Sequence, residues 1–197
     1  MALHGDAIDP LQLLSDWLRA AREADEPMPE AMALATVTSD GWPSARMVIL
    51  RGIDTGLVFF TDGESNKGVE LAAYPRAAVV LHWLAPVHRQ VRATGAVETL
   101  TDEQADEYWH TRRPHIRWTA AAWVQSQVVA SREDLQERAS SFERSFPDGD
   151  LARPSRWGGY RVVPTIVEFW QEAPDGIHDR FRYSRAGASW TIDRLSP

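Results

Sequence analysis

The chain has 197 residues and a mass of 22.2 kDa, with 44% hydrophobic and 25% charged residues, so one domain over residues 1–197 can bury its own core. It has no cysteine, which excludes a disulfide scaffold, a thiol nucleophile and a cysteine-based zinc site, and its net charge of −7 opposes non-specific attraction to nucleic acid or anionic lipid. Its apolar runs are shorter than the roughly 18 residues of a membrane span, and residues 1–6 lack the pattern of a secretion signal, so we expect a cytoplasmic protein that does not enter a membrane.

The N-terminal half is expected to be one helix followed by strands. Pro10, in the first helical position after Asp9, begins a helix over residues 10–24 whose leucines recur at helical spacing. Beyond an acidic, proline-containing linker, apolar residues enriched in strand-forming types alternate with polar ones. The expected strands are 32–38, 44–50, 57–61, 77–83 and 88–98, the first three forming an antiparallel meander, with a short helix at 67–73 after the third.

Residues 101–146 are expected to form a helical insertion. Thr101 and Gln104 form a capping-box pattern, and Ser131 begins a further helix. Strands return at 160–163, 166–170, 180–183 and 190–195, with Pro164 separating the first two. Strands at both ends with helices between them predict a mainly β protein with α: one β-barrel whose last strands close against the first, with the helices packed outside.

Familiar catalytic motifs are missing from the sequence. There is no GxSxG, HExxH, P-loop or GxGxxG pattern, so hydrolase, zinc protease and dinucleotide-binding interpretations lose their main support. The six histidines are scattered, and His110 and His115 have a poor spacing for two ligands on one helical face. We therefore expect no metal site.

A group of basic and hydroxyl-bearing residues indicates an anion site. Arg46 lies on the second expected strand, Thr61 ends the third, and Ser65, Asn66 and Lys67 open the short helix. Neighbouring strands bring such groups together, and guanidinium, ammonium, hydroxyl and helix N-terminal N–H donors suit a phosphate dianion. The alternative is that the two basic residues are solvated surface charges.

Polar side chains also interrupt apolar segments. Gln90, Gln125 and the pair His178 and Arg180 stand inside or beside such segments. A buried polar group without a partner costs about 1–3 kcal/mol, so each is expected to meet a partner or a ligand unless it faces solvent. The nine tryptophans serve either as core or as stacking platforms.

A series of short motifs runs along nearly the whole chain. They are RMVILR at 46–51, FFT at 59–61, SNK at 65–67, RQ at 89–90, YWH at 108–110, AWVQS at 122–126, WGGY at 157–160, EFWQ at 168–171, HDRF at 178–181 and IDRL at 192–195. In this order, over roughly residues 10–197, the chain resembles the pyridoxamine 5′-phosphate oxidase family. The resemblance implies an antiparallel split β-barrel of Greek-key type with flanking helices, a homodimer with FMN at the subunit interface, and oxidation of a small-molecule substrate with O2 as electron acceptor.

The resemblance also implies roles for individual residues. Arg46 and Lys67 would bind the FMN phosphate, helped by Thr61 and Ser65, while the strand 48–51 would lie along the isoalloxazine ring. Residues further along the chain would complete the flavin site across the dimer interface: Gln125, Ser126, Trp170 and Arg180. The full implied FMN set is Arg46, Met47, Val48, Ile49, Leu50, Arg51, Phe60, Thr61, Ser65, Asn66, Lys67, Gln90, Gln125, Ser126, Trp170 and Arg180.

The chain departs from the family mainly where the substrate is expected. Arg51 stands in place of a lysine, and Gly176 in place of the arginine of an Arg-x-His motif. Asn66 also replaces an arginine. One extra residue between Tyr108 and Pro114 leaves either Arg112 or Arg113 as the match for a contact to the substrate phosphate. The implied catalytic residues are His178, Arg113 and Arg51, and the implied substrate-binding residues are Arg51, Tyr108, Arg112, Arg113 and His178.

Three functions are consistent with this resemblance. The main hypothesis is oxidation of pyridoxamine or pyridoxine 5′-phosphate to pyridoxal 5′-phosphate. The alternative is an oxidase for another substrate, as in the phenazine-biosynthetic branch of the family, which Gly176 favours. A second alternative is a non-catalytic flavin-binding protein.

Overall fold

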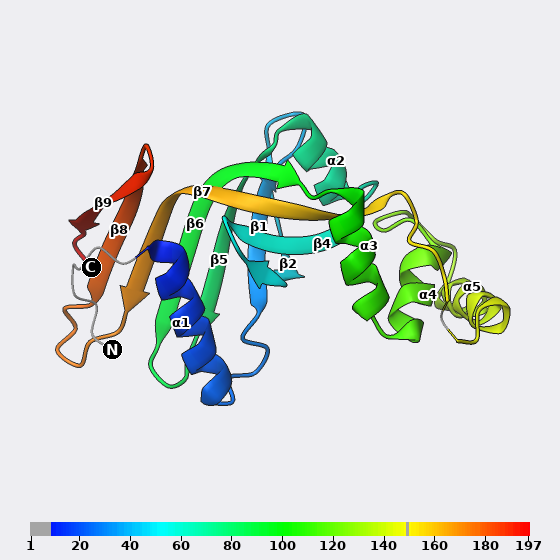
Figure 1. The fold of residues 1–197 in the computed structure, drawn as a ribbon, viewed down its shortest axis with the longest axis horizontal. Coiled ribbons are helices and arrows are strands. Elements are labelled where there is room, and N and C mark those ends of the chain that lie inside the picture. The colour runs from blue at the N-terminus through cyan, green and yellow to red at the C-terminus, as the bar shows by residue number, and fades with distance from the viewer. Residues whose placement is uncertain (1–8, 149) are drawn as a thin grey trace.

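A computed structural model describes residues 9–148 and 150–197; the segment 1–6, for which no secretion signal is expected, lies outside the described residues. A curved sheet carries helix α1 on one side, and α3, α4 and α5 gather at the end away from β8 and β9 (Figure 1). The elements are α1 (Pro10–Glu23), β1 (Ala31–Val37), β2 (Pro43–Ile49), β3 (Gly52–Ile53), β4 (Leu57–Asp62), α2 (Asn66–Ala73), β5 (Arg76–Trp83), β6 (Arg89–Thr99), α3 (Asp102–Thr111), α4 (Pro114–Ala122), α5 (Arg132–Ser145), β7 (Trp157–Gln171), β8 (Asp179–Ala186) and β9 (Ser189–Arg194).

Strand β7 organises the sheet. One of its edges pairs with β6, while the other pairs first with β4, over residues 157–162, and then with β8, over residues 166–171. Beyond β6 the sheet continues through β5 and β1 to β2, and all these pairs are antiparallel. Because one edge of β7 has two successive partners, the sheet forks. This confirms the predicted mainly β architecture, an antiparallel split barrel with flanking helices.

Two details of the predicted strand order are wrong. Strand β4 does not continue a meander from β2, because β2 pairs with β1 while β4 pairs with β3 and β7. Strands β8 and β9 do not close against the first strands within the described residues, because β8 pairs with β7 and β9 with β8. Instead the curvature brings β2 and β4 near each other. Apolar alternation identifies a strand and its buried face but not its neighbour.

The sequence predicts that Pro164 separates two strands, but the structure has one strand there. Strand β7 runs through it without a break. Its pairing with β6 shifts register next to Gly95, and such a bulge tolerates a residue without an N–H donor. A Cβ on Gly95 would lie 1.9 Å from the carbonyl oxygen of Val163, so only glycine allows this close approach.

Helix α1 packs its apolar stripe against the sheet. The Asp9 side chain caps it by accepting from Leu11 N at 2.7 Å, and Pro10 occupies the first turn. Trp17 meets Phe169 of β7 edge to face, with ring centroids 5.0 Å apart. The stripe consists of Leu11, Leu13, Leu14, Trp17, Leu18 and Ala21, all buried. The predicted first helix is confirmed and ends at Glu23.

The predicted helical insertion is confirmed as α3, α4 and α5. The capping box forms as expected: Thr101 Oγ1 accepts from Gln104 N at 3.3 Å, and Gln104 Oε1 accepts from Thr101 N at 3.1 Å. These helices pack through a separate small core around Trp109, whose Nε1 donates to the Leu151 carbonyl at 2.7 Å beside Trp157. A second core thus stands at the end of β7.

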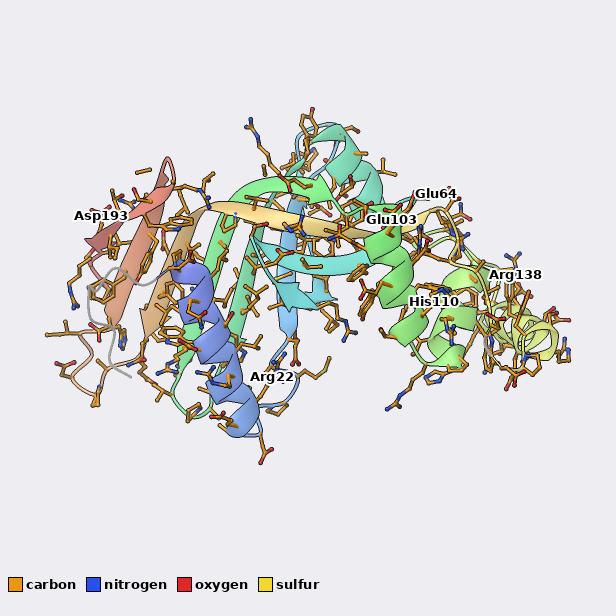
Figure 2. The ribbon with its side chains drawn as sticks, in the orientation of Figure 1. Arg22, Glu64, Glu103, His110, Arg138 and Asp193 are labelled. Carbon is orange, nitrogen blue, oxygen red and sulfur yellow. The ribbon has the colours of Figure 1, made fainter. Side chains whose placement is uncertain are left out.

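Charged and large apolar side chains both lie on the outer surface. Exposed charged or ionisable side chains include Arg22 on α1, His110 on α3 and Asp193 on β9 (Figure 2). Within the described residues, no helix combines the length and the apolarity that crossing a membrane requires.

Candidate functional site

Two adjoining cavities lie beside β2, the larger between β2, β4 and the α3–α4 corner and the smaller between β2, α2 and residues 125–126. The larger, of about 590 Å³, is lined by these predicted residues: Met47, Val48, Ile49, Arg51, Phe60, Thr61, Lys67, Tyr108, Arg112, Arg113 and Gln125. Thr111, Ile116 and Trp157 line it as well and were not predicted. The smaller, of about 410 Å³, shares Met47, Lys67 and Gln125 with it and adds Ser44, Ala45, Arg46, Asn66 and Ser126. Most of the predicted site residues from the first two thirds of the chain therefore come together.

Lys67 stands where the two cavities meet. Ser65 caps helix α2 by accepting from Gly68 N at 3.3 Å, which places the lysine in the first turn. The Lys67 ammonium is buried and donates to Thr61 Oγ1 at 3.1 Å, to Ser65 Oγ at 3.2 Å and to Gln125 Oε1 at 2.6 Å. Burial, and then the charge of Arg46, lower the pKa of Lys67 from its usual value, although nearby carboxylates oppose this. A bound anion would stabilise this ammonium.

Arg46 lines the smaller cavity and is held by a carboxylate that sequence analysis missed. Its Nη2 donates to the buried Glu70 at 2.7 Å and to Ser44 Oγ at 2.6 Å, and its Nη1 donates to Thr36 Oγ1. Burial raises the pKa of Glu70, but hydrogen bonds from Thr36 and Arg46, with the arginine's charge, outweigh it, so the pKa lies below its usual value. The apolar alternation of β1 gave no signal for Thr36, which occupies a buried position.

The larger cavity is also lined by an aromatic stack and a half-buried guanidinium. Phe60 stacks on Tyr108 at 4.0 Å and on Trp157 at 5.4 Å between ring centroids. The Arg112 guanidinium lies 4.5 Å from the centroid of Trp157, and its buried Nη1 has no hydrogen-bond partner among the described residues. Burial lowers the pKa of Arg112; Tyr108 opposes this shift, and the charges of Arg51 and Arg117 lower the pKa further. This unpaired donor distinguishes Arg112 from Arg113, which is exposed at the start of α4.

Gln125 and Ser126 reach the cavities from their own chain, although they were expected to arrive across a dimer interface. Gln125 accepts from Lys67, and Ser126 Oγ accepts from Asn66 N at 3.4 Å. Ser126 has φ +74°, a left-handed backbone conformation that is unfavourable for residues other than glycine. The segment after α4 is therefore held against α2 within one subunit.

The remaining predicted FMN residues form a separate group. Gln90, Trp170 and Arg180 are directly opposite one another on β6, β7 and β8. Arg180 Nη2 also donates to Glu168 Oε2 at 3.0 Å. None of the three lines either cavity described above, and β8 lies at the end of the molecule away from α3 and α4 (Figure 1).

His178 belongs to this second group. Its ring centroid lies 4.9 Å from that of Trp170, and its Nδ1 accepts from Ala173 N at 3.2 Å. When neutral, the imidazole therefore carries its proton on Nε2. Gly176, two residues earlier, has φ +77° and open space where a side chain would begin. Within one chain, His178 is not brought to Arg51 and Arg113, the other two predicted catalytic residues.

Known proteins similar to this chain cover its whole described length. Residues 19–142 match the family model for pyridoxamine 5′-phosphate oxidase, and residues 157–197 match that for the pyridoxine 5′-phosphate oxidase C-terminal dimerisation region. The pyridoxine/pyridoxamine 5′-phosphate oxidase of Cupriavidus taiwanensis is 47% identical over 97% of this chain and 90% of its own. That of Thermosynechococcus vestitus is 46% identical over 99% of this chain and 92% of its own.

Two solved structures extend the comparison. PhzG from Burkholderia lata, in complex with tetrahydrophenazine-1-carboxylic acid, is 35% identical with a TM-score of 0.91, covering 96% of this chain and 93% of its own. An FMN-binding, pyridoxamine 5′-phosphate oxidase-related protein from Nostoc punctiforme shares the fold, with a TM-score of 0.78 at 18% identity over 96% of this chain and 98% of its own. The sequence matches, which span both the cavity-lining segments and the cross-strand row, show that this chain belongs to the pyridoxamine 5′-phosphate oxidase family.

Proposed function

We propose that this protein is an FMN-dependent oxidase that converts pyridoxamine or pyridoxine 5′-phosphate to pyridoxal 5′-phosphate, with O2 as electron acceptor. The observation that carries the proposal is one cavity lined by two cations, the buried Lys67 and the half-buried Arg112. Such a cavity suits two anions at once, the phosphate of the flavin and the phosphate of the substrate. The names of the relatives at 46–47% identity support the same substrate class.

The donors around Lys67 fit the phosphate of FMN. An ammonium, a guanidinium, two hydroxyls and the backbone N–H of Asn66 face the smaller cavity or border it. Because burial lowers the pKa of Lys67, a dianion beside it would offset the cost of desolvating the ammonium. The sequence has no dinucleotide fingerprint to hold an adenosine half, which favours FMN over FAD. When bound, FMN supplies hydride acceptance and transfer of electrons to O2.

Arg112 is proposed as the main contact for the substrate phosphate. Its Nη1 is buried and finds no partner in the part of the chain that the structure describes, and a buried donor in that state gains from any acceptor that reaches it. Arg51, whose guanidinium lies 5.8 Å from the Tyr108 ring centroid, would add a second positive charge from the opposite wall. Tyr108, stacked on Phe60, would supply the apolar side of the subsite. This arrangement orients a phosphorylated ring within the cavity.

A homodimer would complete the site. The row of Gln90, Trp170 and Arg180, with His178 beside it, lies outside the cavities of its own chain. Trp170, His178 and Arg180 fall within residues 157–197, which match a dimerisation region. We therefore propose that this row faces the cavity of a second copy, where His178, with its proton on Nε2, would orient the substrate.

A second candidate is oxidation of a phenazine-biosynthesis intermediate. The similarity to PhzG at a TM-score of 0.91 favours it, as does Gly176, which leaves out the cation expected above the flavin. The two candidates differ in whether the substrate carries a phosphate.

Anaerobic reduction tests the proposal. The purified protein is stripped of flavin, reconstituted with FMN and mixed with pyridoxamine 5′-phosphate or with unphosphorylated pyridoxamine without oxygen. We expect only the phosphorylated amine to bleach the flavin efficiently, with rapid recovery of colour in air. Failure of the phosphorylated amine to bleach it would reject the proposal. Bleaching without reoxidation in air would indicate that O2 is not the acceptor.

A further inference from the structure

A second network of hydrogen bonds centres on Arg156 and reaches Gln125, which contacts Lys67. Arg156 directly precedes β7, and its guanidinium reaches the C-terminal end of α4. Its Nη2 lies 3.1 Å from the Ala120 carbonyl, 2.9 Å from that of Ala121 and 3.0 Å from that of Trp123. The last carbonyls of a helix have no intrahelical partner and carry partial negative charge, so a cation there stabilises the helix end.

The same guanidinium is tied to β4 through Asp62. Arg156 Nε donates to Asp62 Oδ2 at 3.0 Å, and the aspartate side chain is only 5% exposed. Asp62 Oδ2 also accepts from Gln125 N at 3.2 Å, while Oδ1 accepts from Glu64 N at 2.9 Å. One buried carboxylate therefore fixes both the turn that leads into α2 and the backbone of Gln125.

These contacts determine where the Gln125 side chain lies. Its Oε1 accepts from Lys67 Nζ at 2.6 Å and from Thr61 Oγ1 at 3.1 Å. An amide side chain carries two donors as well as an acceptor, so the group that now accepts from Lys67 can also donate to an anion bound there. Among the described residues, the other two hydrogen-bond acceptors of the Lys67 ammonium, Thr61 and Ser65, come from β4 and from the N-cap of α2.

The backbone next to Gln125 is strained. Ser126 has φ +74°, and this conformation persists only where surrounding contacts determine it. Helix α4 contains no fully buried residue, although Trp118, Ala120 and Ala121 pack against the small core around Trp109. The Arg156 network adds polar contacts at the end of α4 and, through Asp62, at the backbone of Gln125.

We infer that Arg156 is a positioning residue for the flavin phosphate, acting through Asp62 and the α4 carbonyls to hold Gln125 against Lys67. The inference rests on the proposed function, because it assumes that FMN is the anion beside Lys67. Arg156 lines neither of the two cavities. It differs in this from Arg46, whose guanidinium faces the smaller cavity.

The test is a double-mutant cycle in the full-length, flavin-stripped protein, with FMN and riboflavin as the probes. We expect Arg156→Gln to raise the Kd for FMN about tenfold and to change that for riboflavin little, because the lost contacts serve the phosphate end. In a Gln125→Ala background, Arg156→Gln is expected to raise the Kd for FMN less than about twofold, because the two substitutions remove the same coupled contact. A purely structural role would instead lower the Tm and weaken both ligands equally in either background.

Arg153→Gln is the matched control. Arg153 lies in the same segment, but it pairs with Asp102 and Asp106 on α3 and donates to the Trp157 carbonyl at 2.6 Å. We expect it to lower the Tm without changing the Kd for FMN. If Arg156→Gln does not fold, Arg156→Lys, which keeps one cation near Asp62, is expected to retain part of the affinity.

The outcomes separate this inference from the function on which it rests. Wild-type protein that fails to bind FMN would overturn the proposed function and the inference with it. Wild-type protein that binds FMN while Arg156→Gln binds equally well would overturn the inference alone. Full additivity with Gln125→Ala would do the same.

Discussion

Arg46 Nη2 lies 2.7 Å from a carboxylate oxygen of Glu70, so the cation proposed for the flavin phosphate already has a counter-charge within its own chain. The side chains are 20% and 9% exposed, respectively. Because both side chains are largely buried, the ion pair fixes the guanidinium in place. Removing either partner would leave the other as an uncompensated charge. Glu70 thus matters for both folding and the site.

Replacing Glu70 is expected to lower stability in a pH-dependent way. Removal of one partner of a buried ion pair costs about 3 kcal/mol, so Glu70→Ala should lower the free energy of unfolding by about that amount. Because the folded-state pKa of Glu70 is below its usual 4.5, its contribution is present above that value and is lost as the pH falls through the lowered one. Urea unfolding at neutral and acidic pH measures this, and the gap between wild type and variant should narrow in acid.

Glu64→Gln is the control for that experiment. Glu64 is exposed in the β4–α2 loop (Figure 2) and its change should alter stability by less than about 0.5 kcal/mol. An equal loss in both variants would show that the ion pair is not the cause.

The two candidate arginines of the substrate subsite should respond differently. Arg112→Gln removes the buried, unpaired donor and is expected to raise the KM for pyridoxamine 5′-phosphate by one to two decades, the range for a charged hydrogen bond of about 1.5–3 kcal/mol. Arg113→Gln changes an exposed residue, so a rise of less than about threefold is expected. Steady-state kinetics of both variants check this, and the reverse ranking would assign the contact to Arg113.

The proposed dimer makes a complementation test available. Lys67→Met damages the cavity of its own chain, whereas Arg180→Leu damages the row proposed to face the partner's cavity. Neither variant alone should retain FMN. Equal amounts, refolded together, should recover about one quarter of the wild-type flavin, because half the dimers are mixed and each mixed dimer has one intact site. No recovery would mean that both residues serve the same subunit's site.

Much of the fold, but less of the site, could be predicted from the sequence. Helix α1 and the capping box at Thr101 follow from local signals, because periodicity and cap chemistry depend on near neighbours. The pairing of β4 with β7 depends on contacts a hundred residues apart, which alternation does not encode. Lys67 and Arg46 were identified by their chemistry, whereas Glu70 and Arg156 were not, since a lone charged residue reads as surface until its burial is known.

Substitution at Gly176 tests the choice of substrate. Because Gly176 has a positive φ, the experiment needs a control for backbone strain. At φ +77° any side chain costs about 1 kcal/mol, but apart from its two chain neighbours no described residue lies within 4 Å of where a Cβ would stand, so the change should be tolerated. Gly176→Ala brings the strain without a charge, and Gly176→Arg brings the strain and a cation. Relative to the alanine variant, we expect the arginine variant to raise kcat/KM for pyridoxamine 5′-phosphate about tenfold and to leave FMN affinity unchanged. If arginine gives no gain over alanine and the native protein turns over the phosphorylated amine efficiently, then Arg51 or another cation already supplies the missing charge, and Gly176 carries no argument for a different substrate.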